Sequence, residues 1–268
     1  MPNVLVIGGS GVLGSAVVHT LQTERIDFRI GSRHQVKKDS YSTVNQSTEL
    51  PWTRIDLTTG EGLSEALVGI DTVFHLASAP GKLGRAYAET VITRKLLKAL
   101  KQSDVKHILY SSIVGVDKIP YSYYRAKREA EVLIQESQLP FTILRATQFH
   151  NLIDFALSKL MSLPVGFIPK KLLDQPIDVA TVAQELYRLA QAGPQQRILN
   201  LGGPEIMNVG TLTKIWMKHR NVSKPIIPIP TVGSLMKGFA KGDHTCPEKA
   251  TGSKTWDAFL SERYEVSY

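Results

Sequence analysis

The sequence predicts an α/β protein built on a doubly wound parallel sheet. Short apolar runs alternate with amphipathic stretches along the first 150 residues, and a glycine-rich segment follows the first of these runs. An alternation of this kind is typical of βαβ units, in which a helix follows each strand and covers the sheet. After about residue 150 the alternation weakens, and Pro and Gly become frequent. We therefore expect one sheet domain and a small irregular C-terminal lobe.

Most of the expected strands are short runs of largely apolar residues, and each expected helix has apolar residues three or four positions apart. The expected strands are residues 4–7, 28–30, 53–55, 72–76, 107–110, 141–144 and 197–201. The expected helices are residues 12–21, 63–68, 85–101, 123–136, 179–192, 209–217 and 234–240. Asp178 precedes one of these helices and is expected to cap its N-terminus. The two predicted domains are residues 1–150 and residues 151–268, of which residues 176–201 return to the main sheet.

The overall composition is that of an ordinary globular protein, with 43% hydrophobic and 21% charged residues. The net charge of +8 would suit an anionic ligand. The basic residues are scattered, however, and no aromatic–basic recognition motif is present. We therefore expect no nucleic-acid partner.

The single cysteine, Cys246, excludes an intramolecular disulfide and fits a reducing compartment. Cys246 and the nearby His244 are too isolated to predict a metal site. No apolar run reaches 18 residues, and the chain leads directly into the first expected strand without a signal segment. These features favour a cytoplasmic protein without a membrane partner.

A glycine-rich segment, residues 8–14 with the sequence GGSGVLG, stands between the first expected strand and the first expected helix. Glycine lets the backbone turn tightly and lets it approach a pyrophosphate without a Cβ in the way. The N-terminus of the following helix presents free N–H groups and a partial positive charge to phosphates. Because the strand, the glycines and the helix occur together, the segment predicts a Rossmann-type dinucleotide site.

The residues after the second expected strand indicate which dinucleotide is bound. NAD-preferring sites place an acid there to bind the ribose 2′-hydroxyl, whereas this chain has Ser32 and Arg33 with no acid nearby. A serine can hydrogen-bond a phosphate and an arginine can pair with it bidentately, so we expect NADP (NADPH) to be preferred over NAD, with Lys37 adding positive charge. Asp56, after the third expected strand, could accept a hydrogen bond from the adenine amino group or cap the following turn.

Further segments carry a family resemblance: FHLAS at residues 74–78, YSSIVG at 110–115, YYRAK at 123–127, LRATQFHN at 144–151, QPIDV at 175–179 and GGPE at 202–205. With the glycine segment they resemble the short-chain dehydrogenase/reductase superfamily, in its atypical NmrA-like branch, over nearly the whole chain. The resemblance implies that residues 149–151 form a loop that borders the nicotinamide. The residues expected to contact the cofactor are Gly8, Gly9, Ser10, Gly11, Val12, Leu13, Gly14, Ser32, Arg33, Asp56, Leu57, Ala77, Ser78, Lys127 and Phe149.

Tyr123 and Lys127 match the Tyr-x-x-x-Lys pair that supplies the chemistry in active members of this superfamily. Residues four positions apart share one helix face, and an ammonium close to a phenol stabilises the phenolate. The tyrosine could then donate a proton to a carbonyl oxygen as hydride reaches the carbon, while the resemblance implies that Lys127 also binds the nicotinamide ribose. Ser112 would donate a hydrogen bond to the developing oxyanion, unless the register places Ile113 there instead.

Many superfamily members carry an Asn on the helix before the fifth strand, but residues 88–93 of this chain read AETVIT. His75, at the end of the fourth expected strand, is expected to be a packed and hydrogen-bonded histidine.

The predicted function is that of an NADP-dependent oxidoreductase, which reduces a small carbonyl-bearing or otherwise reducible substrate. A non-catalytic NADP(H)-sensing regulatory protein of the NmrA-like branch is the main alternative, and a nucleotide-sugar epimerase-type enzyme is a third. Only the enzymes need Tyr123 and Lys127, so the intact pair favours catalysis. The superfamily often dimerises, which leaves a homodimer open for this chain.

Overall fold

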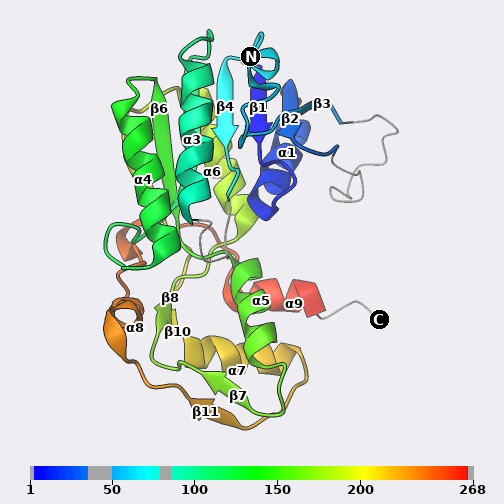
Figure 1. The fold of residues 1–268 in the computed structure, drawn as a ribbon. Helices are drawn as coiled ribbons and strands as arrows, with labels where there is room; N and C mark the ends of the chain where they lie inside the picture. Colours follow the sequence, from blue (N-terminus) through cyan, green and yellow to red (C-terminus); the bar gives the residue numbers. More distant parts are fainter. Residues whose placement is uncertain (1–2, 36–49, 79–85, 265–268) are drawn as a thin grey trace. The chain divides into compact units, whose positions relative to one another are not determined.

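The computed structural model of the chain describes residues 3–35, 50–78 and 86–264 (Figure 1). The chain divides into two compact units and passes between them several times. The first unit comprises Met1–Ser112, Arg125–Leu144 and Val182–Leu199, and the second comprises Ile113–Tyr124, Arg145–Thr181 and Asn200–Tyr268. The sequence-based boundary at residue 150 differs from this division, because residues 113–124 and 145–150, which include the ends of two strands of the main sheet, group with the second unit.

A seven-stranded sheet with the strand order β3-β2-β1-β4-β5-β6-β9 forms the framework of the first unit. The strand β1 lies between β2 and β4 and pairs with both in parallel. The chain therefore reverses its direction of winding between β3 and β4, which confirms the predicted doubly wound α/β fold. The strands are β1 (Val4–Ile7), β2 (Phe28–Ser32), β3 (Trp52–Arg54), β4 (Thr72–His75), β5 (His107–Ile113), β6 (Phe141–Ala146) and β9 (Ile198–Leu201).

Helices cover the sheet, and each predicted helix of this region is present. They are α1 (Val12–Thr23), α2 (Leu63–Ala66), α3 (Ala86–Leu100), α4 (Ser122–Glu136) and α6 (Val179–Ala192). Figure 1 shows α3 and α4 in front of the sheet and α6 behind it. Asp178 accepts hydrogen bonds from the backbone N–H groups of Ala180 and Thr181, at 3.1 and 3.3 Å, which confirms the predicted N-cap of α6.

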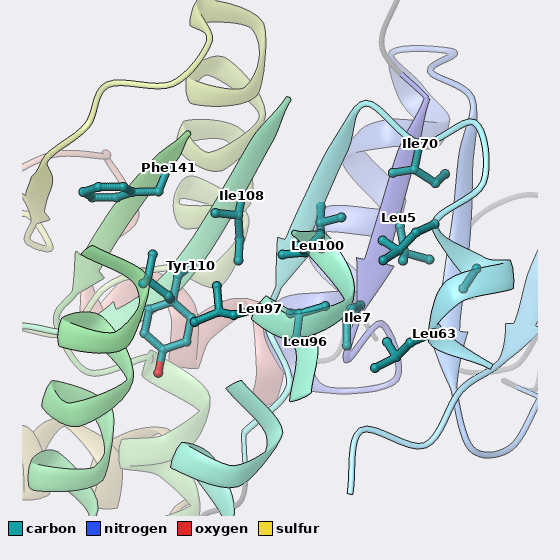
Figure 2. Packing of buried hydrophobic residues seen from close by; sticks show 14 of the residues in the cluster. Leu5, Ile7, Leu63, Ile70, Leu96, Leu97, Leu100, Ile108, Tyr110 and Phe141 are labelled. Carbon is teal, nitrogen blue, oxygen red and sulfur yellow. The ribbon is translucent and has the colours of Figure 1, made fainter. Parts of the chain in front are cut away.

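One core cluster of the first unit lies between the sheet and the helices α2, α3 and α4 (Figure 2). Successive side chains of a strand point to opposite faces of the sheet, so Leu5 and Ile7 of β1 contribute to this core together. In α3, Leu100 stands four positions after Leu96 and three after Leu97, and all three leucines pack into the same cluster. The apolar side chains on one face of the strands thus pack against the apolar side chains on one face of α3.

The second unit has its own core of aromatic and aliphatic side chains, including the buried Trp216, Trp256 and Phe259. Its helices are α5 (His150–Leu160), α7 (Val209–His219), α8 (Gly233–Lys241) and α9 (Trp256–Tyr264), with a 3-10 helix η2 (Pro247–Lys249). Two short sheets pair β8 (Leu173–Asp174) with β10 (Met207–Asn208) and β7 (Gly166–Ile168) with β11 (Ile226–Pro228).

The interpretation of residues 149–151 as a loop is wrong, because helix α5 begins at His150. Phe149 precedes the helix with extended backbone and makes no side-chain capping hydrogen bond, so the usual sequence signal for a helix start is missing. The buried residues Ile153, Leu157 and Met161 stand at helical spacing, but the frequent prolines and glycines that follow obscured this pattern.

Four histidines are almost completely buried, two in each unit: His75 and His107 in the first, His150 and His244 in the second. Burial lowers the pKa of each of them to about 4. The Nε2 of His75 lies 3.1 Å from the Thr93 hydroxyl, which confirms the expected packed, hydrogen-bonded histidine. None of the helices in the described part of the chain combines the length and apolar character needed to cross a membrane.

Candidate functional site

The glycine segment forms a tight turn between β1 and α1. Gly8 follows the strand with a φ of +90°, and a Cβ on it would lie 2.5 Å from the backbone nitrogen of Ala77. A Cβ on Gly14 would collide with the carbonyl oxygen of Gly8, whereas one on Gly11 would come no closer than 3.4 Å to that oxygen. Gly8 and Gly14 therefore allow the loop, the helix and the end of β4 to pack closely, whereas Gly11 has room for a Cβ.

The N-terminus of α1 is open to solvent. Ser10 and Gly11 are exposed, and 52% of Val12 is exposed although its side chain is apolar. The helix has no capping side chain and no acidic residue in its first turn, so no carboxylate within α1 offsets the partial positive charge of the helix end. The free N–H groups at this helix end could bind a pyrophosphate, and the residues present therefore fit a dinucleotide.

Ser32 and Arg33 stand at the end of β2, as the sequence predicts. The two side chains differ in whether they can still bind a phosphate. The Ser32 hydroxyl donates a hydrogen bond to the His34 carbonyl at 2.6 Å and accepts one from the Trp52 indole at 2.9 Å. Its only proton is thus already used. Arg33 is exposed, which leaves it as the side chain able to pair with a phosphate here, while Lys37 lies outside the described residues.

Asp56 and Leu57 follow β3. The Asp56 carboxylate accepts a hydrogen bond from the Thr58 backbone N–H at 2.7 Å. This bond lowers the pKa of Asp56, and the positive charge of Arg33 contributes in the same direction. Asp56 therefore caps its turn, the alternative that the sequence left open, and its predicted contact with adenine stays a prediction. Leu57 is partly buried against the core of the first unit.

The carboxyl ends of β1, β4 and β5 lie in one row. Ile7 pairs with His75, and His75 pairs with Tyr110. The residues that follow these positions therefore occupy the same edge of the sheet, where open α/β sheets bind their ligands. They are Gly8 after β1, Ala77 and Ser78 after β4, and Ser111 and Ser112 in the last part of β5.

Ser112 is buried, with 4% of its surface exposed, and its hydroxyl has no hydrogen-bond partner among the described residues. A buried hydroxyl without a partner costs free energy in the folded state. A ligand oxygen at this edge would remove that cost, and this side chain therefore also fits the predicted site.

Lys127 is almost fully buried and forms an ion pair with Glu89 of α3. Its Nζ lies 2.8 Å from Glu89 Oε1, and the two side chains are 4% and 1% exposed. The ammonium also donates a hydrogen bond to the Ser111 carbonyl at 3.1 Å and lies 4.7 Å from the centre of the Tyr110 ring. Burial is the largest single influence on the pKa of Glu89 and raises it, but the charge of Lys127, the charge of His75 and the hydrogen bonds from Lys127 and Tyr110 together outweigh burial, so the pKa is lowered.

Sequence reasoning did not identify Glu89 as a site residue. It stands in the stretch where many superfamily members carry an Asn. A usable signal was present, because Glu89 is on the same helix face as Leu96 and Leu100. An acid on the apolar face of a helix needs a partner, and the partner proves to be Lys127, which is 38 positions further along the chain.

The remaining predicted residues, Tyr123 and Phe149, belong to the second unit. Tyr123 is partly buried against an apolar cluster that contains Tyr124. The phenol of Tyr124 accepts a hydrogen bond from the Gln148 amide at 2.7 Å, and burial raises its pKa. Tyr124 therefore stays protonated, and the proton-donor role predicted for Tyr123 stays a prediction.

Three curated proteins with different activities or roles in their names match part of this chain. The chain is 26% identical over 212 residues to an NAD(P)H azoreductase of Xenophilus azovorans, covering 76% of this chain and 69% of the relative. It is 30% identical over 153 residues to prestalk A differentiation protein A of Dictyostelium discoideum, covering 55% of this chain and 45% of the relative. The chain spans about half the length of the latter protein and of a matching undecaprenol-linked sugar 4-epimerase of Escherichia coli O157:H7.

Solved structures match over almost the full length. An NADPH-dependent quinone oxidoreductase of Escherichia coli, complexed with NADPH, superposes with a TM-score of 0.78 at 16% identity, covering 97% of this chain and 99% of that one. A nucleoside-diphosphate-sugar epimerase of Staphylococcus aureus gives 0.76 at 19% identity, covering 96% and 99%. At these identities the likeness shows the fold. Residues 8–188, which begin at the glycine segment, match a family model described as NAD(P)H-binding. That match covers more than half of the chain, and the protein therefore belongs to the NAD(P)H-binding family.

Proposed function

We propose that the protein is an NADP-dependent oxidoreductase that reduces a small carbonyl-bearing or otherwise reducible substrate. The observation that carries the proposal is the unpartnered, buried Ser112 hydroxyl. It lies in β5, which neighbours β4, the strand that ends beside the glycine turn. The azoreductase relative and the fold shared with the quinone oxidoreductase support a reductase.

Each residue has a distinct role in the proposed reaction. The bound nicotinamide supplies the hydride. Ser112 donates a hydrogen bond to the substrate oxygen on which negative charge develops. Tyr123 supplies the proton to that oxygen, and Lys127, four positions further along α4, orients the nicotinamide ribose. The α1 N-terminus holds the pyrophosphate, and Arg33 pairs with the 2′-phosphate.

Replacing Tyr123 by phenylalanine is expected to reduce NADPH oxidation by about a hundredfold or more, because the substrate oxygen loses its proton donor. NADPH affinity should change little. Turnover is measured against a panel of quinones, azo dyes and aldehydes. Tyr121→Phe is a matched control, since Tyr121 is a neighbouring tyrosine that is 40% exposed and has no assigned role. Turnover that survives Tyr123→Phe would exclude the proton-donor role.

Replacing Arg33 by glutamine is expected to weaken NADPH binding roughly tenfold and to leave NADH binding unchanged, because only NADPH carries the 2′-phosphate. Binding is followed by quenching of tryptophan fluorescence, and Trp52, hydrogen-bonded to Ser32, is a nearby reporter. Arg54→Gln is the control, since Arg54 is another exposed arginine at the same end of the sheet. An equal loss of affinity for both dinucleotides would contradict the preference for NADP.

Two alternatives have specific support. The buried Lys127 ammonium is already engaged by the Glu89 carboxylate and the Ser111 carbonyl, and this engagement favours a sensor of NADP(H). The sugar-epimerase relatives favour an enzyme that isomerises a nucleotide sugar. NADPH binding without turnover in the substrate panel would support the sensor, and interconversion of nucleotide sugars without net NADPH oxidation would support the epimerase.

A further inference from the structure

A buried polar group lies beneath the edge of the sheet that carries the proposed cofactor site. Glu89 Oε1 accepts two hydrogen bonds, one from the Lys127 ammonium at 2.8 Å and one from the Tyr110 hydroxyl at 2.9 Å. Figure 2 shows the Tyr110 hydroxyl pointing away from the aliphatic side chains of the core. Lys127 also binds the carbonyl of Ser111, which follows Tyr110 in β5. The group is therefore fixed by contacts from β5, α3 and α4.

These residues carry no net charge together. The carboxylate of Glu89 cancels the ammonium of Lys127, and the two atoms are within ion-pair distance. His75, whose ring centre is 5.1 Å from that of Tyr110, is neutral near pH 7 because burial lowers its pKa to about 4. Without Glu89, one uncompensated positive charge would remain in a site from which water is excluded.

The position of this group matters for the cofactor. Ile7, His75 and Tyr110 are in register across β1, β4 and β5, so Lys127 reaches the same edge as the glycine turn. The oxidised nicotinamide ring carries one more positive charge than the reduced ring. A lone ammonium at this edge would repel the oxidised form, and a neutral ion pair would repel it much less.

We propose that Glu89 sets the relative affinity of the protein for NADP⁺ and NADPH by cancelling the charge of Lys127. The inference rests on the proposed binding of NADP at this edge. Glu89 acts through Lys127 and is therefore a positioning residue. Similar affinities for both forms suit an enzyme that must release the oxidised cofactor after each turnover.

The test compares dissociation constants for NADP⁺ and NADPH, measured by calorimetry on the full chain. Glu89→Gln keeps the size and an acceptor for Lys127 but removes the negative charge. It is expected to raise the ratio of the NADP⁺ to the NADPH dissociation constant by about tenfold or more, the effect of one charge several ångströms away at an effective dielectric constant of about 20. Lys127→Met leaves the carboxylate alone and is expected to shift the ratio in the opposite direction.

Two further variants separate charge from structure. The double variant Glu89→Gln with Lys127→Met has no charge in the group, and its ratio should return to within about threefold of the wild type. Glu89→Asp keeps the charge and should do the same. If Glu89→Gln alone does not fold, the ratio of the two dissociation constants is still compared between the wild type, Lys127→Met and the double variant. Circular dichroism checks the fold of each.

The outcomes distinguish the two levels of the proposal. If the wild type binds both dinucleotides and all variants keep its ratio, the inference is overturned and Glu89 is structural only. If the wild type binds neither dinucleotide, the proposed function is overturned together with the inference. A ratio that rises in Glu89→Gln, falls in Lys127→Met and recovers in the double variant establishes the role of Glu89.

Discussion

Replacing Gly14 by alanine is expected to abolish dinucleotide binding and to lower the stability of the first unit by about 1–3 kcal/mol. In an ordinary helix the same change would stabilise by about 1 kcal/mol. Here a Cβ would collide with the Gly8 carbonyl oxygen and approach the Cα of Gly9 to 2.7 Å. Both contacts are with backbone, so no side chain can rotate away, and the turn that faces the phosphates must move.

Gly11→Ala is the matched control for this prediction. Gly11 has a φ of −80°, which any residue adopts, and its Cβ would have room. The thermal unfolding midpoint should therefore stay within a few degrees of the wild type. NADPH binding should still weaken, because the added methyl group stands on the exposed surface of the turn. A Gly14→Ala protein that binds NADPH like the wild type would refute the assignment of this turn as the phosphate site.

Lowering the pH from 7 to 5 is expected to destabilise the protein by several kcal/mol. The pKa of each buried histidine is about 4 in the folded chain, against an ordinary value of 6.5. Between these two values the unfolded chain binds more protons than the folded chain, so stability is complete above pH 6.5 and is lost as the pH falls. Each of the four histidines should contribute a loss of about 2 kcal/mol over this range.

Asp174 acts in the opposite direction. Burial raises its pKa to about 7 from an ordinary value of 3.8, so the folded chain binds the extra proton and gains stability as the pH falls. This gain offsets the loss from about one histidine, and the net effect of acid remains destabilising. Urea unfolding at pH 7, 6 and 5, followed by circular dichroism, measures the net change.

His150→Leu isolates one of the four contributions. The ring of His150 lies against Trp256 and Phe259, with ring centres 5.9 and 5.0 Å apart, and leucine keeps an apolar contact there. The variant should lose stability less steeply with acid, by up to about 1.4 kcal/mol per pH unit. An unchanged slope in His150→Leu would show that His150 is not the buried, neutral group described above.

Local features of the sequence determined much of this fold and part of the site. The apolar runs predicted the strands of the main sheet, because a buried parallel strand must be apolar on both faces. The glycine segment predicted the turn after β1, because at Gly8 and Gly14 only glycine avoids a backbone collision. Arg33 could be predicted as the exposed basic residue at the end of β2 because its position depends on the strand alone.

Only the tertiary structure decided which polar groups are already engaged. The Ser32 hydroxyl is used by His34 and Trp52, and the charge of Lys127 is cancelled by Glu89 on another helix. The physical reason is the separation along the chain between the residues that interact. A strand, a turn or a helix cap is specified by residues a few positions apart, whereas the partner of a buried charge is chosen by packing between elements far apart in the chain. The glycine turn could therefore be predicted from the sequence. The pairing of the Lys127 ammonium with Glu89 could not.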